Sequence, residues 1–216
     1  VNKGLFEKYE IPLPTDYESF VSACQAFDEV GIRGFTAGYY YDYTCMETLQ
    51  GLSASELSSV DGRKWRTTYS APDNTKREGL DDTVWPEAFE RMEQFIQDTG
   101  LNQDDLDMNY DDIVEMYQSG KLAMYFSSSA GVKMLQDQGI NTTFFAFFQE
   151  NGEKWLMTTP YFQVALNRDL TQDETRRKKA MKVLNTMLSE DAQNRIISDG
   201  QDLLSYSQDV NLKLTE

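Results

Sequence analysis

The sequence contains no histidine, only two cysteines and no long apolar run, and each absence narrows its possible function. Without an imidazole, the chain cannot build a Ser-His-Asp or Cys-His nucleophile or an HExxH zinc site. Cys24 and Cys45 lack metal-ligand spacing, so we interpret them as buried core residues, with a single disulfide bridge as the alternative. No stretch of about 18 apolar residues exists that could span a bilayer.

Positive charge is also scarce. The 216 residues include 36 Asp and Glu against 20 Lys and Arg, which gives a formal net charge of −16. Phosphate backbones and bare anionic membranes repel such a chain, so we predict no nucleic-acid partner. The content of 40% hydrophobic residues is enough for a sizeable core. At roughly 150 residues per domain, the length allows one large domain or two small lobes.

Periodicity and turn signals predict an α/β architecture, in which helices alternate with short strands. The first expected helix begins at Thr15, as N-cap of a capping box with Glu18, and ends at Gly31. Residues 52–82 are polar and are expected to be irregular. The other expected helices cover about 84–98, ended by Gly100, then 111–118, 129–138, 173–188 and 189–200. The expected strands are 35–37, 122–126 and 142–148, with a hairpin turn at Asn151-Gly152.

The densest aromatic cluster follows the first expected strand. Tyr39, Tyr40, Tyr41, Asp42 and Tyr43 stand together there. A tyrosine offers an apolar ring face and a polar tip, and a sugar ring requires both. We therefore interpret this loop as a candidate wall of a ligand pocket, with packing beneath residues 52–82 as the alternative.

A serine run follows the strand expected at 122–126. Ser127, Ser128 and Ser129 precede a helix whose first N–H groups lack partners within the helix. These groups can meet a ligand oxygen, or a serine can simply cap the helix, and both roles are compatible.

Acidic residues suggest a calcium site and a catalytic carboxylate pair, but the sequence favours neither. The spacing Asp105-x-Asp107-x-Asn109-x-Asp111 resembles a calcium loop, but Tyr110 occupies the position that requires glycine. We interpret it as a solvated loop that leads into a helix. A pair of carboxylates could hydrolyse glycosides, with Asp42 as the one acid set among aromatic rings. No catalytic or metal-binding residue is predicted.

The order of several motifs resembles the second lobe of extracellular solute-binding proteins, the carbohydrate-type, maltose-binding-protein-like receptors of ABC importers. The resemblance begins at Asn2-Lys3-x-Leu5-Phe6-Glu7-Lys8 and continues through Pro14-Thr15-Asp16-Tyr17-Glu18-Ser19-Phe20. Gly120-Lys121-Leu122-Ala123-Met124-Tyr125 is similar to a strand of that family. The segment from Lys179 through Gln193 is similar to its late helix pair.

The resemblance implies a periplasmic-binding-protein-like fold of type II, consisting of most of the second lobe and part of the first. Residues 1–158 would form the second lobe without its last helices. Residues 159–202 would cross the hinge into the first lobe, and 203–216 would return. The resemblance thus implies a piece that lacks most of the first lobe, and the start Val1-Asn2-Lys3 without a Met is consistent with a processing boundary.

The resemblance also implies a function. The family's ligand contacts match Tyr39–Tyr43, Ser127–Ala130 and, at the hinge approach, Tyr161. We expect a monomeric receptor without cofactor that binds a sugar, delivers it to permease subunits and performs no chemistry. It would be extracellular and lipid-anchored at the cytoplasmic membrane of a Gram-positive bacterium. The alternatives are a carboxylate-based glycoside hydrolase, a lectin-like domain and a purely structural interaction domain.

Overall fold

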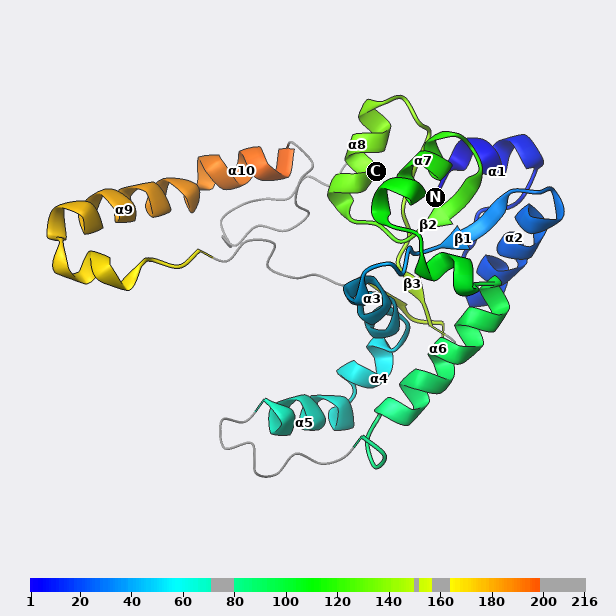
Figure 1. The fold of residues 1–216 in the computed structure, drawn as a ribbon, viewed down its shortest axis with the longest axis horizontal. Helices are drawn as coiled ribbons and strands as arrows, with labels where there is room; N and C mark the ends of the chain where they lie inside the picture. The colour runs from blue at the N-terminus through cyan, green and yellow to red at the C-terminus, as the bar shows by residue number, and fades with distance from the viewer. Residues whose placement is uncertain (71–79, 150–151, 157–163, 199–216) are drawn as a thin grey trace. The chain divides into compact units, whose positions relative to one another are not determined.

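The computed structural model describes residues 1–70, 80–149, 152–156 and 164–198 (Figure 1). Its packing divides the chain into two units, which are described separately. Unit 1 comprises Val1–Ser127 and Gln138–Met157, and unit 2 comprises Ser128–Asp137 and Thr158–Glu216. No helix among the described residues is both long and apolar enough to cross a membrane.

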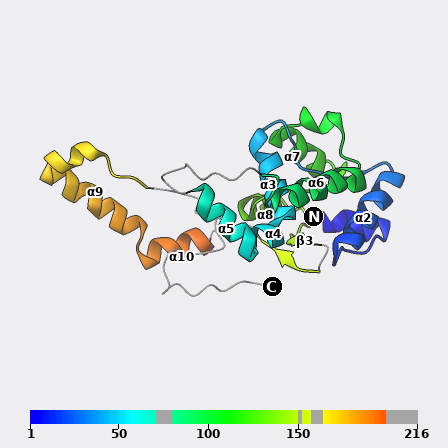
Figure 2. The same ribbon diagram turned by 90° about the horizontal axis from the view of Figure 1, so that it is seen from below.

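Unit 1 is built around a pair of parallel strands, β1 (Arg33–Thr36) and β2 (Leu122–Tyr125). Helix α2 packs along β1 and α7 along β2, as Figure 1 shows, while α6 lies beside α3 (Figure 2). The helices of this unit are α1 (Lys3–Tyr9), α2 (Tyr17–Glu29), α3 (Asp42–Leu52), α4 (Ala54–Ser58), α5 (Val60–Tyr69), α6 (Trp85–Thr99), the 3-10 helix η1 (Gln103–Leu106) and α7 (Tyr110–Gln118).

Aromatic rings from three elements form the centre of the core. Phe20 of α2 and Phe35 of β1 meet edge to face, with centroids 5.5 Å apart, and Phe95 of α6 stacks on Phe20 at 6.0 Å. All three side chains are buried. Edge-to-face and offset contacts of this kind stabilise a core beyond the burial of apolar area, so these rings fix α2 and α6 against β1.

The expected helix starts and stops are largely confirmed, with one shift. Asp16, not Thr15, is the N-cap of α2, and it forms the capping box with Ser19 rather than Glu18. The serine is favoured because its hydroxyl reaches back to the N–H of Asp16 over 3.1 Å. Gly100 ends α6 in the left-handed conformation, as predicted. On α6, Trp85, Met92 and Phe95 are buried, whereas the apolar residues Phe89 and Ile96 are exposed.

The expectation of irregular structure over residues 52–82 is wrong where the structure describes them. Helices α4 and α5 occupy most of 54–69, and Ser59 caps α5 by accepting a hydrogen bond from Gly62 N. Trp65 of α5 packs edge to face on Trp85 of α6 at 5.1 Å. Tertiary contact between the two indole rings stabilises a helix whose own sequence is polar.

The strand expected at residues 142–148 is also shorter than predicted. Phe147–Phe148 (β3) pair with Lys154–Trp155 (β4) in an antiparallel hairpin, and Thr142 forms an isolated antiparallel bridge with Asn2. The predicted turn lies between them, where Gly152 has a φ of +81° and Asn151 falls outside the described residues.

Unit 2 contains α8 (Ser129–Asp137), η2 (Arg168–Gln172), α9 (Glu174–Met187) and α10 (Glu190–Ser198). The basic run at 176–179 is exposed, as expected for a solvated helix face. Ser189 caps α10 by accepting a hydrogen bond from Ala192 N. The predicted hinge start at 159 and the tail at 203–216 lie outside the described residues, and the assignment of segments to lobes stays a prediction.

The two cysteines are free and lie in different environments. Cys24 is buried in the core, as expected, whereas Cys45 on α3 is exposed, contrary to the expectation. Burial raises the pKa of the Cys24 thiol. Partial desolvation, and next the nearby Asp42 carboxylate, raise the pKa of the Cys45 thiol.

We therefore expect Ellman's reagent to modify one thiol in the native chain and two in denaturant. The rate at Cys45 should rise with pH, because the thiolate is the nucleophile and a raised pKa leaves little thiolate at neutral pH. A Cys45→Ser variant, which should be unreactive when native, is the control. Rapid modification of two native thiols would contradict the described burial of Cys24.

Candidate functional site

The carboxyl ends of β1 and β2 form one edge of the strand pair. The strands are parallel, and Thr36 is the register partner of Tyr125. Residues that follow the two strands therefore leave from the same edge, which is where α/β sheets commonly bind ligands. The segment Gly38–Tyr43 follows β1, and Ser127 follows β2. The structure thus brings the predicted tyrosine loop and the first predicted serine to one edge.

Three tyrosines of this loop expose their rings to solvent. The exposed fractions are 58% for Tyr40, 43% for Tyr41 and 56% for Tyr43. Tyr41 meets Tyr40 edge to face, with centroids 4.9 Å apart, and stacks on Tyr43 at 5.6 Å. Tyr41 is the N-cap of α3, and its side chain makes no capping hydrogen bond. These rings form a preorganised aromatic surface.

Tyr39 differs from its neighbours because it points inward. Its hydroxyl is buried and has no hydrogen-bond partner among the described residues. Burial raises the pKa of this phenol, so it remains a neutral hydrogen-bond donor. A buried hydroxyl without a partner costs about 1–3 kcal/mol of stability. A hydrogen bond to a ligand or to water would offset this cost.

A second group of tyrosines lies at the end of β2. The hydroxyls of Tyr125 and Ser127 are both buried without a partner among the described residues. The ring of Tyr110, the first residue of α7, lies 6.4 Å from that of Tyr125. Burial raises the pKa of Tyr125, and the nearby Ser127 hydroxyl opposes that shift. The edge therefore carries three buried hydroxyls, on Tyr39, Tyr125 and Ser127, that make no hydrogen bond of good geometry among the described residues, although those of Tyr125 and Ser127 lie near each other.

The sequence analysis missed Tyr110 and Tyr125. Tyr125 is the last residue of the predicted strand, so its position at the strand end was a usable signal. Nothing in the sequence indicated Tyr110, because its place beside Tyr125 depends on α7 packing antiparallel to β2.

Backbone hydrogen bonds hold the tyrosine loop against the segment that leads into α7. Tyr39 N donates to Asp105 O at 2.9 Å, and Tyr40 N donates to Met108 O at 3.2 Å. The loop turns at Gly38, which has a φ of +65°. A Cβ at that position would lie 2.1 Å from Ile113 Cδ1, so only glycine fits the turn without strain.

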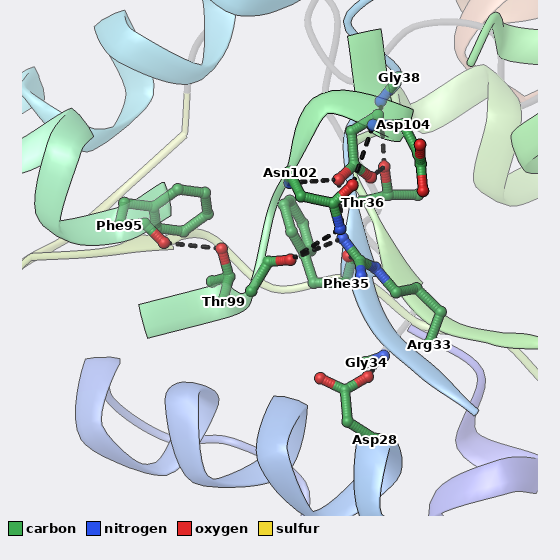
Figure 3. Close-up of polar contacts among 12 residues, drawn as sticks. Asp28, Arg33, Gly34, Phe35, Thr36, Gly38, Phe95, Thr99, Asn102 and Asp104 are labelled. Atoms are coloured by element: carbon green, nitrogen blue, oxygen red, sulfur yellow. Dashed lines mark hydrogen bonds and ion pairs between the residues drawn. The ribbon is translucent and has the colours of Figure 1, made fainter. Parts of the chain in front are cut away.

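A buried ion pair fixes the segment beneath the loop (Figure 3). Arg33 Nη2 lies 2.7 Å from Asp105 Oδ2, and Thr36 Oγ1 donates to Asp105 Oδ1 at 2.6 Å. Asp105 is 1% exposed, so the expectation of a solvated loop is wrong for this residue. Its carboxylate also accepts the N–H of Asn102 at 2.8 Å and thereby joins β1 to η1.

The remaining predicted site residues lie in unit 2, outside the described residues or at the start of α3. Ser128 belongs to unit 2, where its Oγ accepts a hydrogen bond from Gly131 N at 3.4 Å and so serves as a cap. Ser129 begins α8 in the same unit, and Tyr161 lies outside the described residues. Asp42 is exposed in the first turn of α3. The ligand role of all nine residues stays a prediction.

The edge offers ring faces, hydroxyl donors and an exposed carboxylate. These groups can stack on an apolar face and hydrogen-bond to several hydroxyls at once. In the part of the chain that the structure describes, His, Cys, Asp and Glu form no group of three that could hold a metal ion.

Comparisons with known proteins give the chain a context. A family model described as bacterial extracellular solute-binding protein matches residues 1–194. The solved structure of a chitin oligosaccharide binding protein is similar, with 19% identity and a TM-score of 0.63, over 93% of this chain and 49% of that one. This chain thus spans about half the length of that protein.

A second solved structure comes from work on xylan utilization by the thermophilic bacterium Caldanaerobius polysaccharolyticus. It is 19% identical, with a TM-score of 0.49, over 62% of this chain and 32% of that one. No curated protein matches the chain.

Proposed function

Because this chain belongs to the bacterial extracellular solute-binding protein family, we propose that it is part of a receptor that binds a saccharide outside the cell. The α/β fold predicted from the sequence agrees with the likeness to the chitin oligosaccharide binding protein. The name of that protein favours an oligosaccharide among the possible solutes. We further propose that the whole receptor is a lipid-anchored monomer that delivers its ligand to ABC permease subunits without altering it.

One observation carries the proposal: exposed tyrosine rings and unpaired buried hydroxyls lie at the same edge of the parallel strands. The rings of Tyr40, Tyr41 and Tyr43 would contact the apolar faces of a sugar. Tyr39, Tyr125 and Ser127 would donate or accept hydrogen bonds from its hydroxyls. Each satisfied hydroxyl would regain part of the cost of its burial, so affinity would come from both kinds of contact.

Closure of two lobes on the ligand would follow from the same chemistry. A ligand that contacts both lobes only in the closed form shifts the population toward that form. We propose that residues 1–158 contribute one wall of the cleft, residues 159–202 belong to the other lobe and 203–216 return across the hinge. Ser128 and Ser129 are proposed as further contacts from the turn after β2, and Tyr161 as a contact at the hinge approach.

Calorimetry with a panel of neutral oligosaccharides tests this function. The panel should include chitin, xylan, cellulose and starch fragments, and each solution should also be assayed for new reducing ends after prolonged incubation. We expect saturable binding of at least one saccharide and no new reducing ends. Release of reducing sugar by the purified chain would favour the glycoside hydrolase alternative, and binding of no saccharide would remove the proposal.

A further inference from the structure

The tyrosine loop and the segment from the end of α6 through α7 beside it, at the carboxyl edge of β1 and β2, contain no positive charge. No Lys or Arg occurs between Gly34 and Gly62 or between Met92 and Gly120, and these two stretches hold 12 of the acidic residues. They include the tyrosine loop, η1 and α7. Arg33, at the amino end of β1, is the basic residue that directly precedes the first stretch, and its guanidinium is paired with Asp105.

Two helices direct their amino ends toward this edge. Helix α3 follows β1, so it starts where β1 ends, and α7 precedes β2 and runs antiparallel to it. An open helix amino end attracts anions, because its N–H groups and its dipole present positive charge. In many α/β proteins such ends would therefore favour a negatively charged ligand.

Here carboxylates of the chain lie in the first turn of both helices. Asp42 lies in the first turn of α3. Asp111 and Asp112 lie in the first turn of α7, where Asn109 Oδ1 accepts the N–H groups of both and Asp112 Oδ2 accepts that of Asn109 at 3.1 Å. These carboxylates are exposed, so each presents its charge to an incoming ligand.

The acidic groups stand next to the rings proposed to hold the sugar. Asp42 lies between Tyr41 and Tyr43 in the chain, and Asp111 follows Tyr110. The hydrogen bond from Tyr40 N to Met108 O holds the α7 side against the tyrosine loop. A negative group on a bound saccharide would therefore lie within the roughly 8 Å over which charges interact at physiological ionic strength.

We propose that this edge selects uncharged or positively charged saccharides and rejects those that carry carboxylate or sulfate groups. The proposal rests on the proposed saccharide-binding function and adds the charge class of the ligand. Neutral oligosaccharides and partly deacetylated amino sugars would be accepted, whereas uronic acid oligomers would be excluded. Exclusion arises from repulsion by Asp42 and Asp111 and from the lack of Lys and Arg in the stretches 34–62 and 92–120 of unit 1.

Matched ligands that differ mainly in charge test the selectivity. The first pair is the trimer of galacturonic acid and its methyl ester, and the second is the trimer of glucosamine and its N-acetylated form, chitotriose. In the first pair we expect the ester to bind at least tenfold more tightly than the acid. In the second, the cationic trimer should bind at least as tightly as the neutral one and should weaken as salt is added.

Three single-charge variants assign the effect to this edge. Asp42→Asn and Asp111→Asn should each lower the ratio of ester affinity to acid affinity at least twofold, or lower the salt dependence of glucosamine-trimer binding at least twofold. Glu29→Gln is the control, because Glu29 is exposed and ends α2 just before β1, at the opposite edge. Each variant must unfold at the denaturant concentration of the parent chain.

The outcomes separate this inference from the proposed function. Equal binding of acid and ester, or selectivity that Asp42→Asn and Asp111→Asn leave unchanged, would overturn the charge selectivity while saccharide binding stands. Failure of every saccharide in either panel to bind would overturn the proposed function itself.

Discussion

Asp105→Ala is expected to lower the free energy of unfolding by about 3 kcal/mol, because it removes a buried carboxylate and leaves the partly buried guanidinium of Arg33 without its counter-charge. The Asp105 carboxylate accepts hydrogen bonds from Arg33, Thr36 and the N–H of Asn102. Removal of the carboxylate leaves the Thr36 hydroxyl and the Asn102 N–H without this acceptor, while Arg33 keeps its hydrogen bonds to the carbonyls of Phe35 and Gly100. The loss should also loosen the tyrosine loop, because Tyr39 N donates a hydrogen bond to the backbone carbonyl of Asp105.

Urea denaturation followed by tryptophan fluorescence measures this effect. Asp104→Ala is the matched control, because Asp104 is the exposed neighbour in η1 and its side chain should contribute within about 0.5 kcal/mol. Thr36→Val should have an intermediate effect, since it removes one donor and leaves the ion pair intact. Equal stability of the Asp105→Ala and Asp104→Ala variants would contradict the described role of the ion pair.

Gly34→Ala is expected to cost about 3 kcal/mol of stability through overpacking. A Cβ at Gly34 would lie 2.5 Å from both the Cα and the carbonyl oxygen of Cys24. These are backbone atoms of α2, so no side chain can rotate away and the whole helix would have to move off β1.

Gly4→Ala is a control with the same chemical change. Gly4 lies in α1, and the added Cβ would make only an ordinary contact with Asn2 Oδ1 at 3.4 Å. Alanine is preferred over glycine in a helix by up to about 1 kcal/mol, so this variant should be as stable as the parent or more stable. Denaturation midpoints of the two variants that agree within error would refute the close packing of α2 on β1.

Local signals were sufficient for the elements that carry strong periodicity or end signals. Helix α2 shows Phe20, Cys24 and Phe27 at helical spacing, and α6 begins with a proline in its first turn and ends at Gly100. Strand β2 was identified from a short apolar run. These elements are stabilised mainly by residues that are close in sequence, so a short stretch of the sequence is enough to predict them.

Elements stabilised by distant contacts were not predictable in this way. Helix α5 depends on the contact of Trp65 with Trp85, and β3 depends on its pairing with β4. The Arg33–Asp105 ion pair joins residues far apart in the chain, and from sequence Asp105 was one acid in an acidic loop. A single sequence does not say which of many acids meets a given arginine.

In the candidate site, too, some residues could be predicted from local signals and others depend on distant contacts. The tyrosine loop and Ser127 stood out because each follows an expected strand, and parallel pairing of the strands brings their ends together. Tyr110 and Tyr125 did not stand out, because their contribution arises from the packing of α7 against β2. The unpaired hydroxyls are likewise a property of tertiary burial, which residue type alone does not reveal.

The proposed saccharide binding requires that the carboxyl edge of β1 and β2 contacts the ligand. Calorimetric titration of the tightest-binding oligosaccharide into the Tyr41→Ala and Tyr69→Ala variants tests this claim most directly. The two rings are exposed to 43% and 44%, but Tyr69 lies on α5, where it stacks on Trp65. Neither substitution removes a side-chain helix cap.

We expect Tyr41→Ala to weaken binding by about tenfold or more, which corresponds to about 1.4 kcal/mol, and Tyr69→Ala to leave the affinity unchanged. Parent affinity in the Tyr41→Ala variant, or an equal loss in both variants, would contradict the placement of the ligand at this edge.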